Sequence, residues 1–126
     1  MNILLAYNDT DASNRALERA AQLARLYEAK LIVTSVRPFL IGLAQLDGPG
    51  PELQRADARL RELGIEAELV EAVGDIPAAI VEVADTSDVG LIVLGTREPS
   101  QVERMLGHSV SQNVQRMAHC DVLIVH

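Results

Sequence analysis

Two short apolar runs flank an amphipathic stretch in residues 3–33, ILLAYNDTDASNRALERAAQLARLYEAKLIV. Residues 3–6 and 31–33 are continuously apolar, as expected of strands that are covered on both faces of a parallel sheet. The stretch between them places apolar residues at helical spacing, with charged and polar residues on the other side. Thr10 or Asp11 is the expected N-cap of this helix. Its predicted buried residues are Leu17, Ala20, Ala21, Ala24 and Tyr27.

Three further strands are expected along the chain. Residues 91–94 and 122–125 are again continuous apolar runs. Residues 66–71 instead alternate polar and apolar side chains, which is typical of a more exposed edge strand. Together with the first two runs, these segments predict five strands separated by helical stretches.

Three more helices are expected between these strands. One begins at Pro51, where a missing N–H costs nothing, and ends before Gly64. The next follows Asp75, with Pro77 in its first turn, and the last spans residues 109–118. The residues expected on their apolar sides are Leu53, Ala56, Leu60, Leu63, Ile80, Val83, Ala84, Val110, Val114 and Met117.

The alternation of strands and helices predicts an α/β fold with a mostly parallel sheet, right-handed crossovers and helices on both faces. At 126 residues the chain has the size of one domain, so residues 1–126 are expected to form a single unit. Residues 38–50, PFLIGLAQLDGPG, are irregular. We expect a loop packed on its own domain, and the alternatives are a lid over a pocket or part of a subunit interface.

The composition argues against nucleic-acid binding. Acidic residues outnumber basic ones 18 to 11, which gives a net charge of −7. Binding to a phosphate backbone requires a basic face, and aromatic residues for stacking on bases make up only 2% of the chain. We therefore expect no nucleic-acid partner.

The chain carries no sign of export or membrane insertion. Cys120 is its only cysteine, so it forms no intrachain disulfide and no cysteine-based zinc cluster. No apolar run approaches the roughly 20 residues of a transmembrane helix, and the N-terminus lacks the pattern of a signal peptide. A cytoplasmic protein without a membrane partner is expected.

Residues that can bind a ligand follow two of the expected strands. In an open α/β sheet, ligands bind at the carboxyl ends of the strands, near the point where the strand order reverses. Asn8 and Asp9 follow the first strand, and Gly95 and Arg97 lie at the end of the fourth. Residues 109–111 open the last helix, whose N–H groups can hold an anion. Alternatively, Ser109 only caps this helix and Gly95 only forms a turn.

Three segments carry a resemblance to a known family. ILLAYNDTDASNRALERAAQLA, GDIPAAIVEVADTSDVGLIVLGTR and HSVSQNVQRMAHCDVLIVH resemble parts of the universal stress protein family, in the right order and at the right spacing. The resemblance implies the strand order 3-2-1-4-5. It also implies a homodimer that pairs through the last strand, whose residues are Val122, Leu123, Ile124 and Val125.

Some members of this family bind ATP or AMP, and these resemble one another in a glycine-rich signature. The signature is Gly, two residues, Gly, nine residues, Gly, and then Ser or Thr. On this chain its positions fall on Gly95, Glu98, His108 and Ser109, and the family's aspartate after the first strand falls on Asn8. Sliding the pattern by one residue would use Gly107 as the third glycine, but His108 then follows in place of Ser or Thr.

These departures weaken the predicted phosphate site. Glu98 lacks the backbone freedom of glycine, and its carboxylate repels phosphate. Asp9 adds further negative charge, whereas protonated His108 would attract phosphate. We expect binding of ATP through this loop to be weak or absent. The candidate nucleotide-binding residues are Asn8, Asp9, Gly95, Arg97, Gly107, His108, Ser109, Val110 and Ser111.

The sequence therefore predicts a non-catalytic, dimeric stress-response module with a degenerate nucleotide-binding loop and no required cofactor. The alternative is a sensor of the same family that binds ATP or AMP. No catalytic constellation is recognisable, and the sequence identifies no protein partner. His108, His119 and His126 are too dispersed to form a metal site with Cys120.

Overall fold

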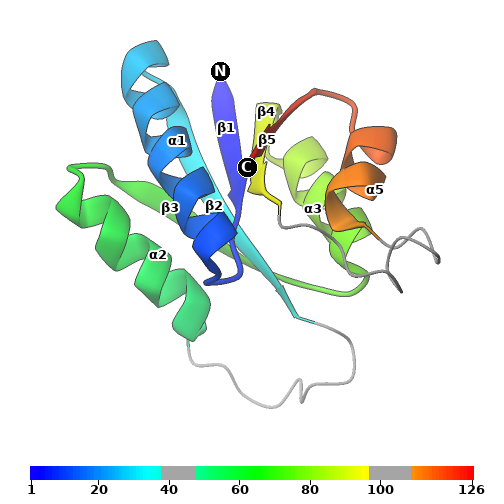
Figure 1. Cartoon of the computed structure of the whole chain (residues 1–126), viewed down its shortest axis with the longest axis horizontal. Coiled ribbons are helices and arrows are strands. Elements are labelled where there is room, and N and C mark those ends of the chain that lie inside the picture. The colour runs from blue at the N-terminus through cyan, green and yellow to red at the C-terminus, as the bar shows by residue number, and fades with distance from the viewer. Residues whose placement is uncertain (38–47, 97–108) are drawn as a thin grey trace.

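The computed structural model describes residues 1–37, 48–96 and 109–126. Strands and helices alternate throughout (Figure 1). The strands are β1 (Asn2–Ala6), β2 (Lys30–Arg37), β3 (Ala67–Val73), β4 (Val89–Gly95) and β5 (Asp121–Val125). The helices are α1 (Asp11–Tyr27), α2 (Pro51–Glu62), α3 (Ile76–Thr86) and α5 (Val110–Met117).

The five strands form one sheet in the order β3-β2-β1-β4-β5, and every neighbouring pair is parallel. This confirms the predicted α/β fold and its strand order. β3 lies at one edge, as its alternating sequence predicts, and β5 lies at the other. The strand order reverses between β1 and β4.

The register of the sheet aligns the carboxyl ends of its central strands. Ala6, near the end of β1, lies opposite Thr34 of β2 and Leu94 of β4. Parallel strands share one direction, so β1 and β4 both end at this level, whereas β2 continues to Arg37 beside β3. Segments that follow β1 and β4 therefore meet although they are far apart in the sequence.

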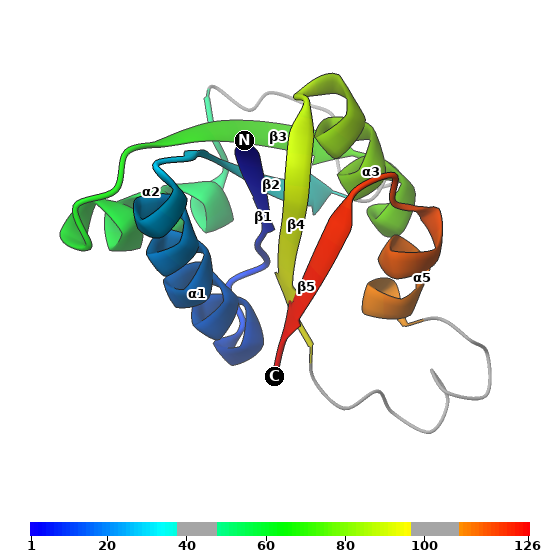
Figure 2. The same cartoon turned by 90° about the horizontal axis from the view of Figure 1, so that it is seen from above.

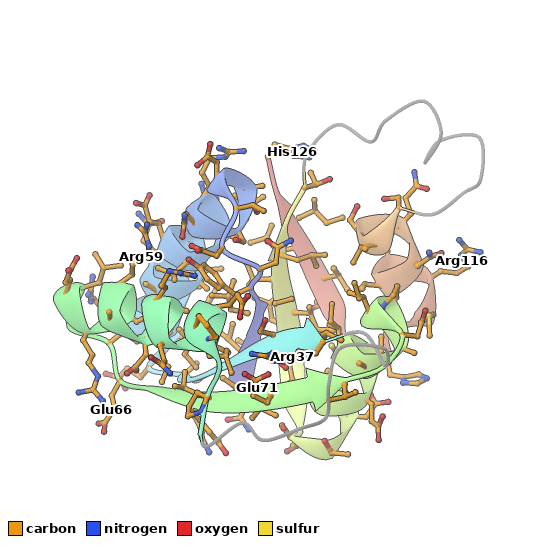
Figure 3. The ribbon with its side chains drawn as sticks, turned by 90° about the horizontal axis from the view of Figure 1, so that it is seen from below. Arg37, Arg59, Glu66, Glu71, Arg116 and His126 are labelled. Carbon is orange, nitrogen blue, oxygen red and sulfur yellow. The ribbon has the colours of Figure 1, made fainter. Side chains whose placement is uncertain are left out.

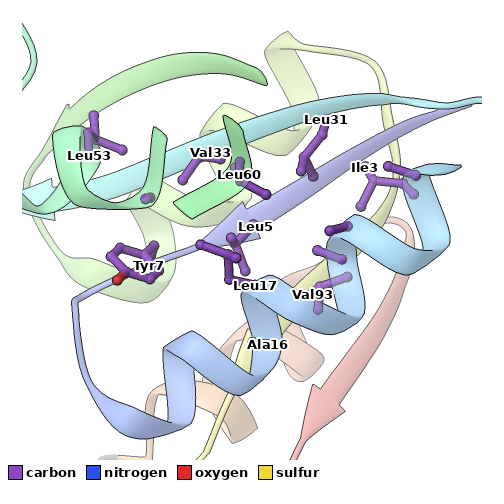
Figure 4. Close-up of a cluster of buried hydrophobic side chains, with 14 residues drawn as sticks. Ile3, Leu5, Tyr7, Ala16, Leu17, Leu31, Val33, Leu53, Leu60 and Val93 are labelled. Atoms are coloured by element: carbon purple, nitrogen blue, oxygen red, sulfur yellow. The ribbon is translucent and has the colours of Figure 1, made fainter. Parts of the chain in front are cut away.

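Helices cover both faces of the sheet, with α1 and α2 on one face and α3 and α5 on the other (Figure 2). Successive side chains of a strand point to opposite faces, so Ile3 and Leu5 enter the core under α1 and α2. Leu4 enters the core under α3 and α5. Figure 4 shows the first of these cores, which includes the ring of Tyr7. The continuously apolar runs are thus explained by burial on both sides.

Local signals place the helix ends as predicted. The hydroxyl of Thr10 accepts a hydrogen bond from the backbone N–H of Ser13, and Thr10 is the N-cap of α1. Pro51 opens α2. Beyond its other end, Gly64 has φ +78°, and the N–H of Ile65 donates to the carbonyl of Leu60.

Four residues predicted to be buried are exposed instead. Tyr27 is 59% exposed, Leu63 40%, Val110 37% and Met117 41%. All four lie at or just beyond the ends of their helices. The helical spacing of apolar residues includes these positions, but the sheet does not cover them. Cys120 is half-buried. Of the irregular segment, residues 38–47 lie outside the described residues.

Candidate functional site

A cavity of about 300 Å³ lies at the carboxyl ends of β1, β2 and β4, where the strand order reverses. Its walls come from these strand ends and from the N-terminal residues of α1, α3 and α5. Its apolar lining consists of Ala6, Tyr7, Ala12, Val36, Ile76, Ile80, Leu94 and Val110. Asn8, Thr10, Ser13, Thr34, Thr96, Ser109 and Ser111 supply polar groups, and Gly95 completes the wall.

The described lining is apolar or polar but uncharged. Eight of its side chains, including that of Tyr7, carry hydroxyl or amide groups, and none carries a carboxylate, ammonium, guanidinium or imidazole. An apolar pocket with a few polar groups is the usual form of a small-molecule site, and about 300 Å³ is at the small end of the range for such pockets. The described part of the cavity therefore suits a small, partly apolar ligand.

Two buried hydroxyl groups donate their protons to the protein. The Thr34 hydroxyl, which is fully buried, donates to the carbonyl of Val70 at 2.8 Å. The Ser13 hydroxyl donates to the carbonyl of Thr10 at 3.0 Å. The Ser13 hydroxyl also accepts from the backbone N–H of Thr10 at 2.9 Å, so it is engaged as donor and acceptor within the turn. A hydroxyl has one proton but two lone pairs, so the Thr34 hydroxyl keeps a lone pair that can accept from an N–H group.

The N-terminus of α5 forms one wall of the cavity. Ser109 is the N-cap of this helix, and its hydroxyl accepts from the N–H of Gln112 at 3.3 Å. The hydroxyls of Ser109 and Ser111 lie 3.1 Å apart. Ser109 thus fulfils the capping role considered as an alternative, and it also lines the cavity. Unpaired N–H groups and the positive end of the helix dipole favour a negatively charged group at such a wall.

Gly95 lines the cavity and also allows the start of α1 to pack closely on β4. A Cβ atom at this position would lie 2.2 Å from the carbonyl oxygen of Ala12 and 2.9 Å from the N of Ser13. The backbone at the start of α1 therefore packs directly on the end of β4. The alternative considered for Gly95 was a turn, whereas Gly95 is the last residue of β4 and its structural role is this helix–strand contact.

Tyr7 and Asp9 form a polar cluster beside the cavity. The Tyr7 hydroxyl is 2.6 Å from Oδ1 of Asn14 and 3.0 Å from Oδ1 of Asp9. Burial, together with the Asp9 carboxylate, raises the pKa of Tyr7 from 10.0 to about 12. Asp9 is not part of the cavity lining, because its other carboxylate oxygen pairs with Nη1 of Arg55 at 2.9 Å. The expected repulsion of an anion by Asp9 is therefore offset by Arg55.

The predicted site residues fall into three groups. Asn8, Gly95 and residues 109–111 meet at the cavity, whereas Asp9 points to α2. Arg97, Gly107 and His108 lie outside the described residues, as does Glu98. The sequence reasoning missed Thr34, Val36, Ser13, Ile76 and Ile80. Thr34 could have been found, because it is a polar residue that directly follows the predicted strand 31–33, at the end of the strand where ligands bind.

Among residues 1–37, 48–96 and 109–126, no three histidine, cysteine, aspartate or glutamate side chains are arranged to hold a metal ion. Within the same ranges, no helix has the length and apolar character needed to cross a membrane.

The chain is similar to known proteins over its full length. The model of the universal stress protein family matches residues 1–126. Universal stress protein YxiE of Bacillus subtilis is 31% identical, over 98% of this chain and 97% of the relative. Universal stress protein Rv1636 of Mycobacterium tuberculosis is 34% identical, over 98% of this chain and 94% of the relative.

Solved structures agree with this similarity. A universal stress protein in complex with cAMP has a TM-score of 0.85 and 30% identity, and the match covers 100% of this chain and 97% of that one. The protein from Archaeoglobus fulgidus in complex with dAMP has a TM-score of 0.73 and 27% identity, with 100% and 98% covered. The chain therefore belongs to the universal stress protein family.

Proposed function

We propose that this chain is a non-catalytic stress-response module whose cavity binds an adenine mononucleotide. The observation that carries the proposal is the uncharged cavity of mixed apolar and polar lining at the reversal of strand order, with the N-terminus of α5 as one wall. The relatives solved with cAMP and dAMP support the same class of ligand. The function thus combines features of both predictions from the sequence.

The chemistry of the walls matches the parts of such a ligand. A purine is flat and apolar on its faces, which suits a lining of aliphatic side chains such as Val36, Ile80 and Leu94. The lone pairs of the Thr34 hydroxyl can accept from an exocyclic amino group. A single phosphate can be held by the N–H groups at the start of α5.

A triphosphate fits this site less well than a monophosphate. The described lining has no cationic side chain to balance further phosphate charge, and the cavity is small. Glu98 replaces a glycine of the family's signature with a carboxylate. We therefore propose that AMP-like ligands bind and that ATP binds weakly, which retains the predicted degeneracy of the loop.

The non-catalytic part of the proposal rests on the side chains that line the cavity. Proton transfer requires a positioned group that titrates near the working pH, most often histidine or a carboxylate. The described lining supplies hydroxyl and amide groups instead. Binding and release of a ligand, with dimerisation through β5, are then the functions of the module.

Thermal unfolding with added ligand tests this proposal. Adenosine or AMP at about 100 times its dissociation constant should stabilise the chain by about 2.7 kcal/mol. Val36→Phe should abolish the effect because it fills the cavity. Val73→Phe is the matched control, since this exposed residue of β3 is not part of the lining. The absence of stabilisation by millimolar adenosine or AMP would refute the proposed function.

The variant Glu98→Gly tests the account of the degenerate loop. It should strengthen binding of ATP more than binding of adenosine, because only ATP carries the phosphates that the carboxylate repels. Calorimetric titration of both ligands measures the difference. Equal affinities of the variant and the parent protein for ATP would show that the carboxylate does not limit phosphate binding.

A further inference from the structure

We infer that Arg55 of α2 is a positioning residue for the ligand cavity, acting through Asp9 on the turn that carries Asn8 and Thr10. This inference rests on the proposed function, because the turn forms part of the cavity wall. Arg55 itself does not line the cavity. It lies 46 positions from Asp9 along the chain, and its guanidinium meets the carboxylate at 2.9 Å.

The backbone of Asp9 needs support from its surroundings. Its φ is +57°, in the left-handed region of backbone conformation that residues other than glycine rarely adopt. Aspartate is among the residues that tolerate this region best, so the conformation is accessible but not favoured by the chain alone. Such a backbone persists when neighbouring groups hold it in place.

Two groups on different elements hold the Asp9 carboxylate. Oδ1 accepts from the hydroxyl of Tyr7, whose ring is anchored in the core at the end of β1 (Figure 4). Oδ2 accepts from Nη1 of Arg55. The Tyr7 hydroxyl shares its single proton between Asp9 and Oδ1 of Asn14, so Arg55 is the main group that directs the Asp9 side chain towards α2. Its neighbours in the chain, Asn8 and Thr10, then line the cavity and are joined by a hydrogen bond of 2.8 Å.

The helix that carries Arg55 is itself fixed to the sheet. The N–H of Gly50, the N-cap of α2, donates to Oε1 of Glu71 on β3 at 2.6 Å. Arg37, the last residue of β2, pairs with the other oxygen of Glu71 at 3.4 Å. Figure 3 shows these two side chains next to each other, near the start of α2. Leu53 and Leu60 of α2 are fully buried against the sheet, so the helix that carries Arg55 is held in place.

Arg55 also balances charge beside the cavity. Without it, the hydroxyl of Tyr7 would be the remaining contact of the Asp9 carboxylate among the described residues, and the carboxylate would be free to turn towards an anionic ligand. Loss of the pair thus has two effects, a change in the position of residues 8–10 and an uncompensated negative charge. The first affects any ligand, whereas the second affects only ligands with phosphate.

Calorimetric titration of Arg55→Gln with adenosine and with AMP tests the inference. The pair is more than half exposed on the Arg55 side, and such pairs contribute modestly, so affinity for adenosine should fall by about two- to fivefold. The loss for AMP should be larger, because the carboxylate then repels the phosphate. Arg55→Lys should restore part of the affinity, since it keeps the charge but not the fork of donors.

Arg61→Gln is the matched control. It removes the same charge from the same helix, but Arg61 pairs with Asp57 on the exposed side of α2. It should bind both ligands like the parent protein, and both variants should retain the parent's melting temperature within a few degrees. In the Asp9→Asn background, Arg55→Gln should have little further effect, because the group through which it acts is gone.

Each outcome separates the inference from the function on which it rests. If the parent protein binds neither adenosine nor AMP, the proposed function fails. If the parent binds and Arg55→Gln binds both ligands equally well, the positioning role is overturned. A loss for AMP alone would also overturn it, because Arg55 would then act only as a charge. Full effects of Arg55→Gln in the Asp9→Asn background would show that Asp9 does not transmit the effect.

Discussion

Gly95 joins two elements that must approach closely. The start of α1 packs on the last residue of β4 so tightly that even a methyl group would overlap the carbonyl of Ala12. This contact brings the segments that follow β1 and β4 to the same cavity. The position therefore requires glycine for packing, independently of any contact that its backbone makes with a ligand.

Gly95→Ala should lower the free energy of unfolding by about 1–3 kcal/mol, because the obstructing atoms belong to the backbone and cannot move aside. Gly90→Ala on the same strand is the control. Its added methyl group would meet only the flexible side chain of Met1, so we expect a smaller loss. Urea denaturation measures both. Equal losses would contradict the packing account of Gly95.

Tyr7 makes stability depend on pH in the alkaline range. Its pKa is about 12 in the folded chain against 10.0 for an unperturbed tyrosine, so the folded state retains the proton more strongly. The contribution is fully present below pH 10 and is lost as the pH rises towards 12. Since each unit of pKa shift corresponds to about 1.36 kcal/mol, the contribution of Tyr7 to the free energy of unfolding is at most about 3 kcal/mol.

Tyr7→Phe should therefore lose less stability than the parent protein between pH 10 and pH 12. Titration of the phenolate absorbance gives an independent measurement. The chain has two tyrosines and no tryptophan, so one of its two phenolate signals should rise only near pH 12. Parallel pH dependences of the variant and the parent would show that Tyr7 is not the group responsible.

At the scale of elements, α2 is held on the sheet by a narrow stripe of apolar side chains. Leu53, Ala56 and Leu60 are fully buried, whereas Leu63, next in the same stripe, is 40% exposed. The helix has ended by that point, and Gly64 turns the chain towards β3. Leu60 is therefore the last residue of the stripe that we expect to stabilise the fold strongly, although the apolar spacing continues to Leu63.

Leu60→Ala should destabilise the chain by about 2–5 kcal/mol, because it leaves a cavity between α2 and the sheet. Leu63→Ala, the same substitution three residues later, should cost less than about 1 kcal/mol. Chemical denaturation of the two variants gives the comparison. A larger loss for Leu63→Ala would mean that the apolar stripe extends beyond the end of the helix.

The sequence predicted the elements well because their signals are local. Apolar runs such as residues 91–94 read directly as strands that are buried on both faces. Tyr27 and Met117 were placed wrongly because burial at a helix end depends on where the neighbouring element stops, which spacing does not encode. The orientation of Asp9 depends on Arg55, a partner from a distant segment, so no local pattern could have predicted it.

At the scale of the whole molecule, the sheet has two different edges. β3 carries charged side chains, including Glu68, which pairs with Lys30 on the adjacent strand at 2.7 Å. The last four residues of β5 are Val122, Leu123, Ile124 and Val125, all half-buried and uncharged. Among the strands that the structure describes, β5 has a neighbour on one side only, and an apolar edge of this kind favours pairing with another strand.

We therefore predict a homodimer that pairs through β5. Size-exclusion chromatography with light scattering at micromolar concentration should give twice the mass of the 13.7 kDa chain. Hydrogen exchange should then show slow exchange along residues 122–125. A monomer mass under these conditions would contradict the prediction, and so would a dimer whose β5 amides exchange freely.

The central claim is that an adenine mononucleotide occupies the cavity at the carboxyl ends of β1 and β4. Titration of the isotope-labelled chain with AMP, followed by amide NMR, tests it most directly. We predict saturable shifts at Ala6, Gly95, Ser109 and Ser111, which line the cavity, and none at Leu63 on the far end of α2. Unchanged spectra at millimolar AMP, or shifts confined to residues outside the lining, would contradict the claim.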